Sequence, residues 1–99
     1  MTTYVMLGTW TDMGMRDIGK SPARLEGLKR QLQDMGGQFT AFYMTMGDCD
    51  FVLIYEAPDE AVAARFCLLL GRAGNVRTRT MKAFSERTFR EVVQSLGAG

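Results

Sequence analysis

The 99 residues carry twelve basic and eleven acidic side chains, two cysteines and no histidine. This length and near-neutral charge indicate one small domain, residues 1–96, and argue against a nucleic-acid binder or an anionic-membrane binder, which would carry a strong positive field. The two cysteines, the lack of a signal-like N-terminus and the lack of a membrane-spanning apolar run predict a cytoplasmic protein with free thiols.

The N-terminal third of the chain predicts a strand, then a turn or a single helical turn, and then a helix. Residues 3–10 are rich in β-formers, while two glycines weaken any helix within residues 12–20. A helix is expected to begin with Ser21 as its N-cap and to end at Gly36 and Gly37. Its apolar stripe consists of Leu25, Leu28, Leu32 and Met35. This stripe predicts that the helix covers one face of a sheet.

Two further runs of β-formers, residues 38–46 and 51–56, meet at a turn and predict a hairpin with Met46 opposite Phe51. Alternation along the strands assigns the side chains to two faces. One face carries Phe42, Met44, Met46, Phe51, Leu53 and Tyr55, and the other carries Phe39, Ala41, Tyr43, Thr45, Val52 and Ile54. Because both faces are apolar, the sheet is expected to be covered on both sides.

A second helix follows the hairpin. The acidic residues in 58–60 lie near its positive N-terminal end, a stabilising position, and Gly71 and Gly74 are predicted to end it. Its apolar stripe consists of Val62, Phe66, Leu69 and Leu70. Together with the first helix it covers one face of the sheet.

The last segments are a basic strand and a short helix. Residues 75–84 form a fourth strand rich in threonine and basic side chains. Ser85 with Glu86 caps the final helix, and residues 97–99 are expected to form a flexible tail. The side chains spaced for burial on this helix are Phe89, Val92, Val93 and Leu96.

The order of these elements predicts an α+β fold, the ferredoxin-like βαββαβ arrangement with an antiparallel four-stranded sheet and an extra C-terminal helix. Its two main helices cover only one face of the sheet. Since burial of one apolar side chain contributes about 1.5 to 3 kcal/mol, an uncovered apolar face would be costly. The sequence therefore predicts a homodimer, or a higher homo-oligomer, that packs sheet on sheet as a dimeric α+β barrel.

Several short segments together form a specific pattern, although each is weak alone. They are Thr3-Tyr4-Val5, Trp10-Thr11-Asp12-Met13-Gly14, Ser21-Pro22-Ala23-Arg24, Phe42-Tyr43-Met44-Thr45-Met46-Gly47, Asp50, Glu56-Ala57-Pro58-Asp59 and Gly74-Asn75-Val76-Arg77-Thr78. With them the chain resembles the GYD-domain family over nearly its whole length. The name-giving motif, Gly-x-Tyr-Asp, stands here as Gly47-Asp48-Cys49-Asp50, so a role of the family tyrosine does not transfer to Cys49.

The resemblance implies the dimeric α+β barrel architecture. Other proteins with this barrel include haem-dependent oxidases, cofactor-free monooxygenases, isomerases and ligand-sensing domains of transcription regulators. Because a fold does not select a function, the resemblance implies no particular activity.

The absence of histidine removes the usual haem ligand, the commonest zinc ligand and the side chain best suited to proton transfer near neutral pH. No cofactor and no metal are therefore expected. Met44, Met46 and Cys49 are soft ligands for copper, but packing of methionine in apolar gaps explains the first two better. Cys49 is expected to be a turn residue, with an accessible thiol as the alternative, and Cys67 a small buried apolar residue.

The candidate ligand pocket lies at the rim of the barrel and is lined by Tyr4, Trp10, Tyr43, Thr45 and Arg77. Aromatic walls with a few polar groups are typical of small-molecule sites, although buried interface aromatics would explain the same residues. The basic strand allows two interpretations. Its charges discourage pairing at a sheet edge, or Arg77 binds a ligand carboxylate or phosphate.

Two functional hypotheses follow from the sequence. The preferred one is a non-catalytic homo-oligomeric module that is structural or holds a small apolar or acidic ligand between its sheets. The alternative is a cofactor-free isomerase or monooxygenase, in which Tyr43 or Asp50 acts as acid or base and Arg77 stabilises a developing anion. The residues alone do not decide between a binding module and an enzyme.

Overall fold

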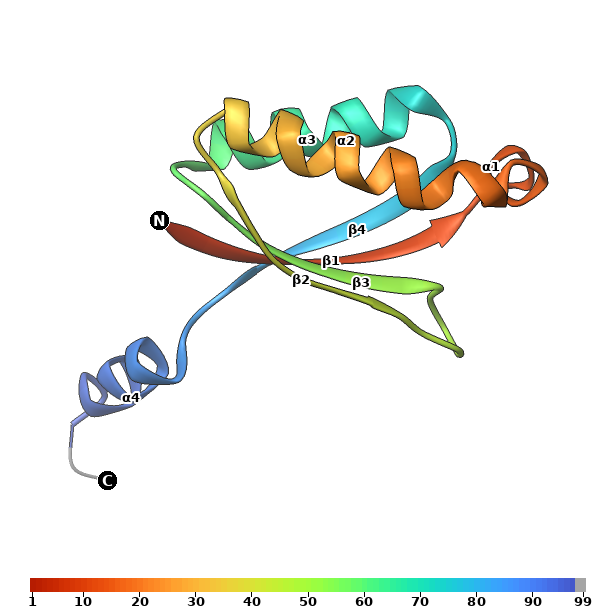
Figure 1. Cartoon of the computed structure of the whole chain (residues 1–99). Helices are drawn as coiled ribbons and strands as arrows, with labels where there is room; N and C mark the ends of the chain where they lie inside the picture. The colour runs from red at the N-terminus through yellow and green to blue at the C-terminus, as the bar shows by residue number, and fades with distance from the viewer. Residues whose placement is uncertain (98–99) are drawn as a thin grey trace.

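The computed structural model describes residues 1–97 and shows one sheet with two long helices on one of its faces (Figure 1). The elements are β1 (Thr2–Trp10), α1 (Asp12–Arg16), the 3-10 turn η1 (Ile18–Lys20), α2 (Ser21–Asp34), β2 (Gln38–Met44), β3 (Phe51–Ala57), α3 (Glu60–Ala73), β4 (Val76–Ala83) and α4 (Glu86–Gln94). The strands are antiparallel and lie in the order β2-β3-β1-β4. This arrangement confirms the predicted ferredoxin-like α+β fold.

The hydrophobic core lies between the sheet and the two helices. α2 packs over β2, and α3 packs over β3 and β4. Phe66 of α3 meets Tyr55 of β3 edge to face, with ring centroids 5.0 Å apart. The largest fully buried side chains are Tyr55, Phe66, Met6, Leu32 and Leu53. The predicted apolar stripes therefore face the core, with Leu32 and Phe66 at their centres, except for Leu69, which is not part of the core.

The helix ends follow the sequence signals with two exceptions. Gly36 and Gly74 have φ values of +89° and +83°, which favour glycine, and they end α2 and α3 as predicted. Gly71 lies inside α3, so its prediction as a helix end was wrong. The prediction of Ser21 as an N-cap was also wrong, because η1 runs directly into α2 and Lys20 occupies the cap position.

The β2–β3 hairpin has a different register from the predicted one. Met44, and not Met46, lies opposite Phe51. The predicted turn over residues 47–50 was too short, because the Thr45 N–H donates to the carbonyl of Asp50 at 2.8 Å and closes a longer loop. A shift of two residues leaves the side chains of β2 next to the loop on their predicted faces, since alternation has a period of two.

Phe39 lies on the opposite face from the predicted one. The pairing of β2 with β3 skips Thr40, which is an extra residue in β2. Such a β-bulge reverses the alternation on one side of it, so Phe39 shares the face of Tyr55 and packs against the core. The ammonium group of Lys29 in α2 lies 5.4 Å from the centroid of the Phe39 ring.

The second face of the sheet carries no helix within residues 1–97 (Figure 1). We call this surface the open face. Its centre on β1 and β3 is apolar and half-exposed, and its edges on β2 and β4 are exposed. It comprises Val5, Leu7, Val52 and Ile54 at the centre, Tyr43 at one edge, and Arg77, Arg79 and Met81 at the other. One chain thus covers only one face of its sheet, as the sequence predicts.

α4 stands apart from the rest of the fold at the end of the segment that continues from β4 (Figure 1). Ser85 caps it as predicted, because its hydroxyl accepts the Thr88 N–H at 3.1 Å. The predicted burial of its apolar stripe was wrong for a single chain, since the helix points away from the core. Phe89 is 60% exposed, and Val92, Val93 and Leu96 are also exposed. Of the predicted flexible tail, residues 98–99 lie outside the described residues.

Candidate functional site

The structure does not gather the five predicted pocket residues in one place. Tyr4 and Trp10 point toward the helices. Tyr43 and Arg77 belong to the open face, where they occupy the two opposite edge strands. Thr45 lies in the loop between β2 and β3. A pocket between two sheets would therefore include Tyr43 and Arg77 but neither Tyr4 nor Trp10.

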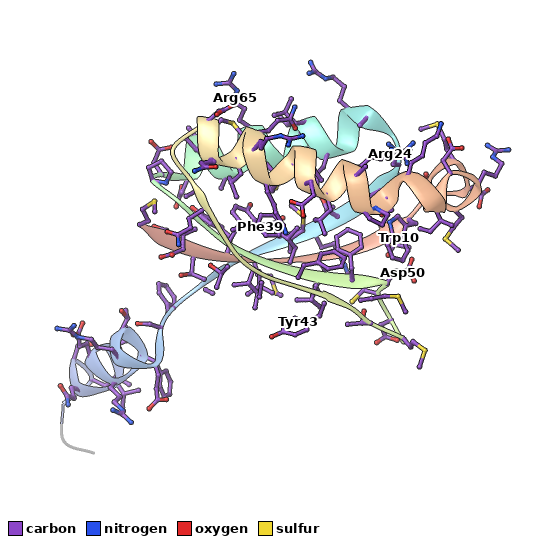
Figure 2. The ribbon with its side chains drawn as sticks, in the orientation of Figure 1. Trp10, Arg24, Phe39, Tyr43, Asp50 and Arg65 are labelled. Carbon is purple, nitrogen blue, oxygen red and sulfur yellow. The ribbon has the colours of Figure 1, made fainter. Side chains whose placement is uncertain are left out.

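The three residues of the enzyme hypothesis are also separated. The carboxylate of Asp50 accepts the backbone N–H of Trp10 at 3.0 Å and holds the end of β1. Tyr43 is 61% exposed and points away from the helices (Figure 2). Arg77 is on the far side of β3 and β1 from Tyr43. Within one chain, no acid, base and anion-binding group formed by these three residues converges on one point in residues 1–97.

The loop between β2 and β3 holds Cys49 in a half-buried position. Its carbonyl accepts a hydrogen bond from the Thr45 hydroxyl at 2.7 Å, and its Sγ lies 3.6 Å from the same hydroxyl. This geometry agrees with the predicted turn residue. The prediction that Met44 and Met46 pack in apolar gaps does not hold within one chain, because both side chains are exposed. The exposed fraction of Met46 is 92%. Among residues 1–97, no group of three or more Cys, Asp or Glu side chains is arranged to hold a metal ion.

A small, part-buried polar cluster lies between α3 and the sheet. The Sγ of Cys67 lies 3.1 Å from the Thr80 hydroxyl and 3.8 Å from the Tyr55 hydroxyl, so Cys67 is more than the predicted apolar filler. The pKa of Tyr55 is raised above its ordinary value, mainly by burial and to a smaller extent by the neighbouring Cys67 thiol. The Tyr4 ring stacks on Tyr55 with centroids 5.5 Å apart, and its buried hydroxyl has no hydrogen-bond partner within residues 1–97. The surroundings of Tyr55 therefore favour its uncharged form.

The end of β1 is the point where four segments meet. The Thr11 N–H donates to the carbonyl of Asn75 at 3.0 Å, and the Thr11 hydroxyl donates to the carbonyl of Gly74 at 2.7 Å. The same hydroxyl accepts the Gly14 N–H at 3.1 Å. Gly14 approaches so closely that a Cβ there would lie 2.1 Å from the Asn75 carbonyl oxygen. These contacts fix the position of Trp10, the residue before Thr11.

A cleft of about 580 Å³ opens beside this junction, between α2, α3 and the sheet. Three aromatic side chains of the sheet form its floor, and both helices contribute side chains to its walls. The residues that line it are Trp10, Ser21, Arg24, Leu25, Gly27, Leu28, Arg30, Gln31, Asp34, Phe42, Phe51, Leu53, Leu70, Ala73, Asn75 and Val76. Of the five predicted pocket residues, only Trp10 belongs to this cleft.

The polar lining of the cleft, which includes Arg24, Gln31 and Asp34, was not predicted, because the first helix was placed on the sheet by its apolar stripe alone. That reasoning follows the apolar stripe of a helix and does not detect a gap between two helices. The signal in the sequence was Gly27, which interrupts a helix without being needed to end it. The cleft is therefore visible in the structure but could not be predicted from the sequence pattern.

No helix within residues 1–97 has both the length and the apolar character required to cross a membrane.

Comparison with known proteins gives a family and a relative. A family model described as the GYD domain matches residues 4–93, which confirms the resemblance inferred from the sequence. A protein of Thermus thermophilus described as a glutamine synthetase and cystathionine beta-lyase binding protein is 38% identical over 84 residues, which make up 84% of this chain and 88% of that protein.

Solved structures share the fold at lower sequence identity. The leucine response regulatory protein LrpA of Mycobacterium tuberculosis superposes with a TM-score of 0.63 and 19% identity over 85% of this chain and 51% of LrpA. This chain thus spans about half the length of that regulator. A hypothetical protein of Pyrococcus horikoshii superposes with a TM-score of 0.56 and 18% identity over 87% of this chain and 93% of that chain. At these identities the similarity shows the fold alone.

Proposed function

This chain belongs to the GYD-domain family, and we propose that it is a homo-oligomeric module that binds other proteins. The observation that supports this proposal is that one chain leaves two apolar surfaces uncovered, the open face and the stripe on α4. Apolar area in contact with water costs free energy in proportion to its size, so each surface gains when another protein covers it. The open face belongs to the sheet and the apolar stripe belongs to α4, so a partner is assigned to each surface separately.

A second copy of the chain is the partner that we propose for the open face. Val52 and Ile54 of β3 lie beside Val5 and Leu7 of β1 at its centre, while polar side chains lie at its edges. An apolar centre with a polar rim is the usual anatomy of a protein interface. A twofold axis through the middle of the sheet would place the central strands of one copy on those of the other, an isologous contact.

A different protein is the partner that we propose for α4. A helix of nine residues is marginal in water without packing, although the Ser85 cap and the ion pairs Glu86–Arg90 and Arg87–Glu91 support it locally. An amphipathic helix with exposed apolar anchors fits the groove of another protein. The relative from Thermus thermophilus, described as binding glutamine synthetase and cystathionine beta-lyase, supports a role in protein binding.

The oligomer is tested by placing a charge at the centre of the open face. We expect the wild-type chain to be a dimer or larger at micromolar concentration in light scattering, and Val52→Glu to be a folded monomer, because a buried unpaired charge is strongly unfavourable. Ala64→Glu adds the same charge to the exposed side of α3 and should leave the oligomer intact. A wild-type monomer would contradict this half of the proposal.

The second half of the proposal, the binding of another protein by α4, is tested by calorimetric titration. The titrants are purified glutamine synthetase and cystathionine beta-lyase from the organism that produces this chain. Val93→Glu changes the apolar stripe of α4 and should abolish binding, whereas Gln94→Glu changes the next residue and should not. Both variants should keep the wild-type oligomer. If Val93→Glu instead yields a monomer, α4 covers a second copy and the assignment of its partner is wrong.

A further inference from the structure

The cleft between α2 and α3 is separate from both surfaces assigned above, because it lies on the helical side of the sheet. We propose that it binds a mainly apolar aromatic carboxylic acid, whose ring system lies against Trp10, Phe51 and Phe42 and whose carboxylate pairs with Arg24. The volume of about 580 Å³ falls within the range of small-molecule sites.

The floor of the cleft is a continuous row of aromatic rings. The Trp10 and Phe51 ring centroids are 5.5 Å apart, and the Phe51 and Phe42 centroids are 5.6 Å apart. Two hydrogen bonds hold the backbone at Trp10. Asp50 accepts the N–H of Trp10, and the hydroxyl of the next residue, Thr11, donates to the carbonyl of Gly74. The rings are inclined to one another, by 46° between Trp10 and Phe51 and by 26° between Phe51 and Phe42, so the floor is apolar without being planar. Such a floor suits a ligand whose body is an apolar ring system.

The width of the cleft depends on small residues that face it from the two helices, Gly27 in α2 and Ala73 in α3. A Cβ added at Gly27 would meet no atom within 4 Å, so neither packing nor positive φ requires glycine there. Glycine inside a helix costs about 1 kcal/mol relative to alanine. A larger side chain at this position would narrow the cleft.

The positive charge of Arg24 determines which polar group of a ligand fits this end of the cleft. Arg24 lies at the same end of the fold as Trp10, on α2 above it (Figure 2). Its guanidinium nitrogen is 3.7 Å from the Asp17 carboxylate, which is an ion pair but longer than a hydrogen bond. The planar guanidinium holds five N–H donors and suits a bidentate carboxylate. An acid whose carboxylate reaches this end of the cleft therefore meets a cation, and its apolar body meets the rings.

The test uses 1-naphthaleneacetate and its neutral amide, 1-naphthaleneacetamide, which share a ring system and differ in charge. Because the chain has one tryptophan, the indole N–H signal of Trp10 in a ¹H–¹⁵N spectrum reports on the cleft without ambiguity. We expect saturable binding of the acid that moves this signal, and binding of the amide about tenfold weaker, the loss expected for a charge-assisted hydrogen bond. Arg24→Gln should reduce the affinity for the acid to that for the amide.

The control for the position of binding is a pair of glycine variants. Gly27→Leu places a side chain in the cleft and should abolish binding, whereas Gly71→Leu changes an equally open glycine of α3 outside the cleft and should leave the affinity unchanged. Circular dichroism shows whether both variants fold, and Gly27→Ala is the smaller change if Gly27→Leu does not. The proposal is overturned if the acid does not bind, if the acid and the amide bind equally, or if Gly27→Leu and Gly71→Leu behave alike.

Discussion

The carboxylate of Asp50 accepts the backbone N–H of Trp10 at 3.0 Å, across 40 residues of chain. The Asp50 N–H in turn donates to the carbonyl of Gly8 at 2.8 Å. Asp50 is the last residue of the segment that corresponds to the name-giving family motif, and it fastens the β2–β3 loop to the end of β1. In this chain the aspartate of the motif therefore has a structural role that is complete without a ligand.

Removal of this contact should destabilise the fold. We expect Asp50→Ala to lower the free energy of unfolding by about 1 to 3 kcal/mol, because a part-buried backbone N–H loses its charged acceptor. Asp50→Asn keeps an acceptor oxygen and should cost less. Asp48→Ala, at an exposed position of the same loop, should change stability by no more than about 0.5 kcal/mol. Denaturant titrations at one fixed protein concentration measure all three, and equal losses for Asp48→Ala and Asp50→Ala would contradict the assignment.

Gly8 and Phe51 form a second close pair, opposite each other on β1 and β3. A Cβ at Gly8 would lie 2.0 Å from the Phe51 ring, so Gly8→Ala should overpack the core and cost about 1 to 3 kcal/mol. Gly19→Ala, where a Cβ meets no atom within 4 Å, is the matched control and should be nearly neutral.

The cause of that loss is identified by a double-mutant cycle in thermal or chemical unfolding. In the background of Phe51→Leu, which removes the ring, Gly8→Ala should cost clearly less than in the wild type, because the two sites are coupled. If the losses of unfolding free energy for Gly8→Ala and Phe51→Leu are additive, the Phe51 ring is not what excludes a methyl group at position 8. The cycle also tests whether glycine in this strand exists to accommodate the aromatic floor of the cleft.

The fold could be predicted from the sequence because its main signals are local. The run from Phe51 to Tyr55 is apolar at every position, which requires cover on both faces wherever the strand lies. The bulge at Thr40 could not be predicted in the same way, because it depends on how β2 packs under α2 and leaves no mark in the residue types nearby. The loop length likewise depends on the hydrogen bond between Thr45 and Asp50.

The cleft was beyond reach of the sequence for a related reason. An apolar stripe such as the one with Leu25 and Leu28 indicates which side of α2 faces the sheet. It does not indicate how far α2 lies from α3. The role of Arg24 depends on that distance. Trp10 was predicted to line a pocket between two sheets and lines this cleft on the helical side instead, and Gly27 has no side chain that could indicate a role.

Tyr55 gives the protein a pH dependence above the ordinary tyrosine range. Its pKa is raised from 10.0 by burial first and by Cys67 second, so the folded chain keeps the phenolic proton where the unfolded chain loses it. The unfolded state then binds fewer protons, and stability falls as pH rises. This contribution is fully present below about pH 10 and is lost as pH rises toward the folded pKa.

The Tyr55→Phe variant isolates this effect. Above pH 10 the free energy of unfolding of the wild type should fall more steeply than that of the variant, by up to about 1.4 kcal/mol per pH unit for one group. Below this range the two curves should differ by a constant offset only. Urea titrations at several pH values measure the slopes, and parallel curves through the alkaline range would show that Tyr55 ionises in the folded state as it does in the unfolded chain.

α4 should be dispensable for the stability of the domain, because it stands apart from the sheet and from both long helices (Figure 1). A chain that ends at Phe84 should therefore unfold with a free energy within about 0.5 kcal/mol of the full chain, compared at equal concentration. It should keep the oligomer, since the open face is unchanged, and lose the binding of the partner enzyme. A drop in stability that depends on protein concentration would instead place α4 in the contact between copies, because a helix that covers a second chain stabilises only the assembled state.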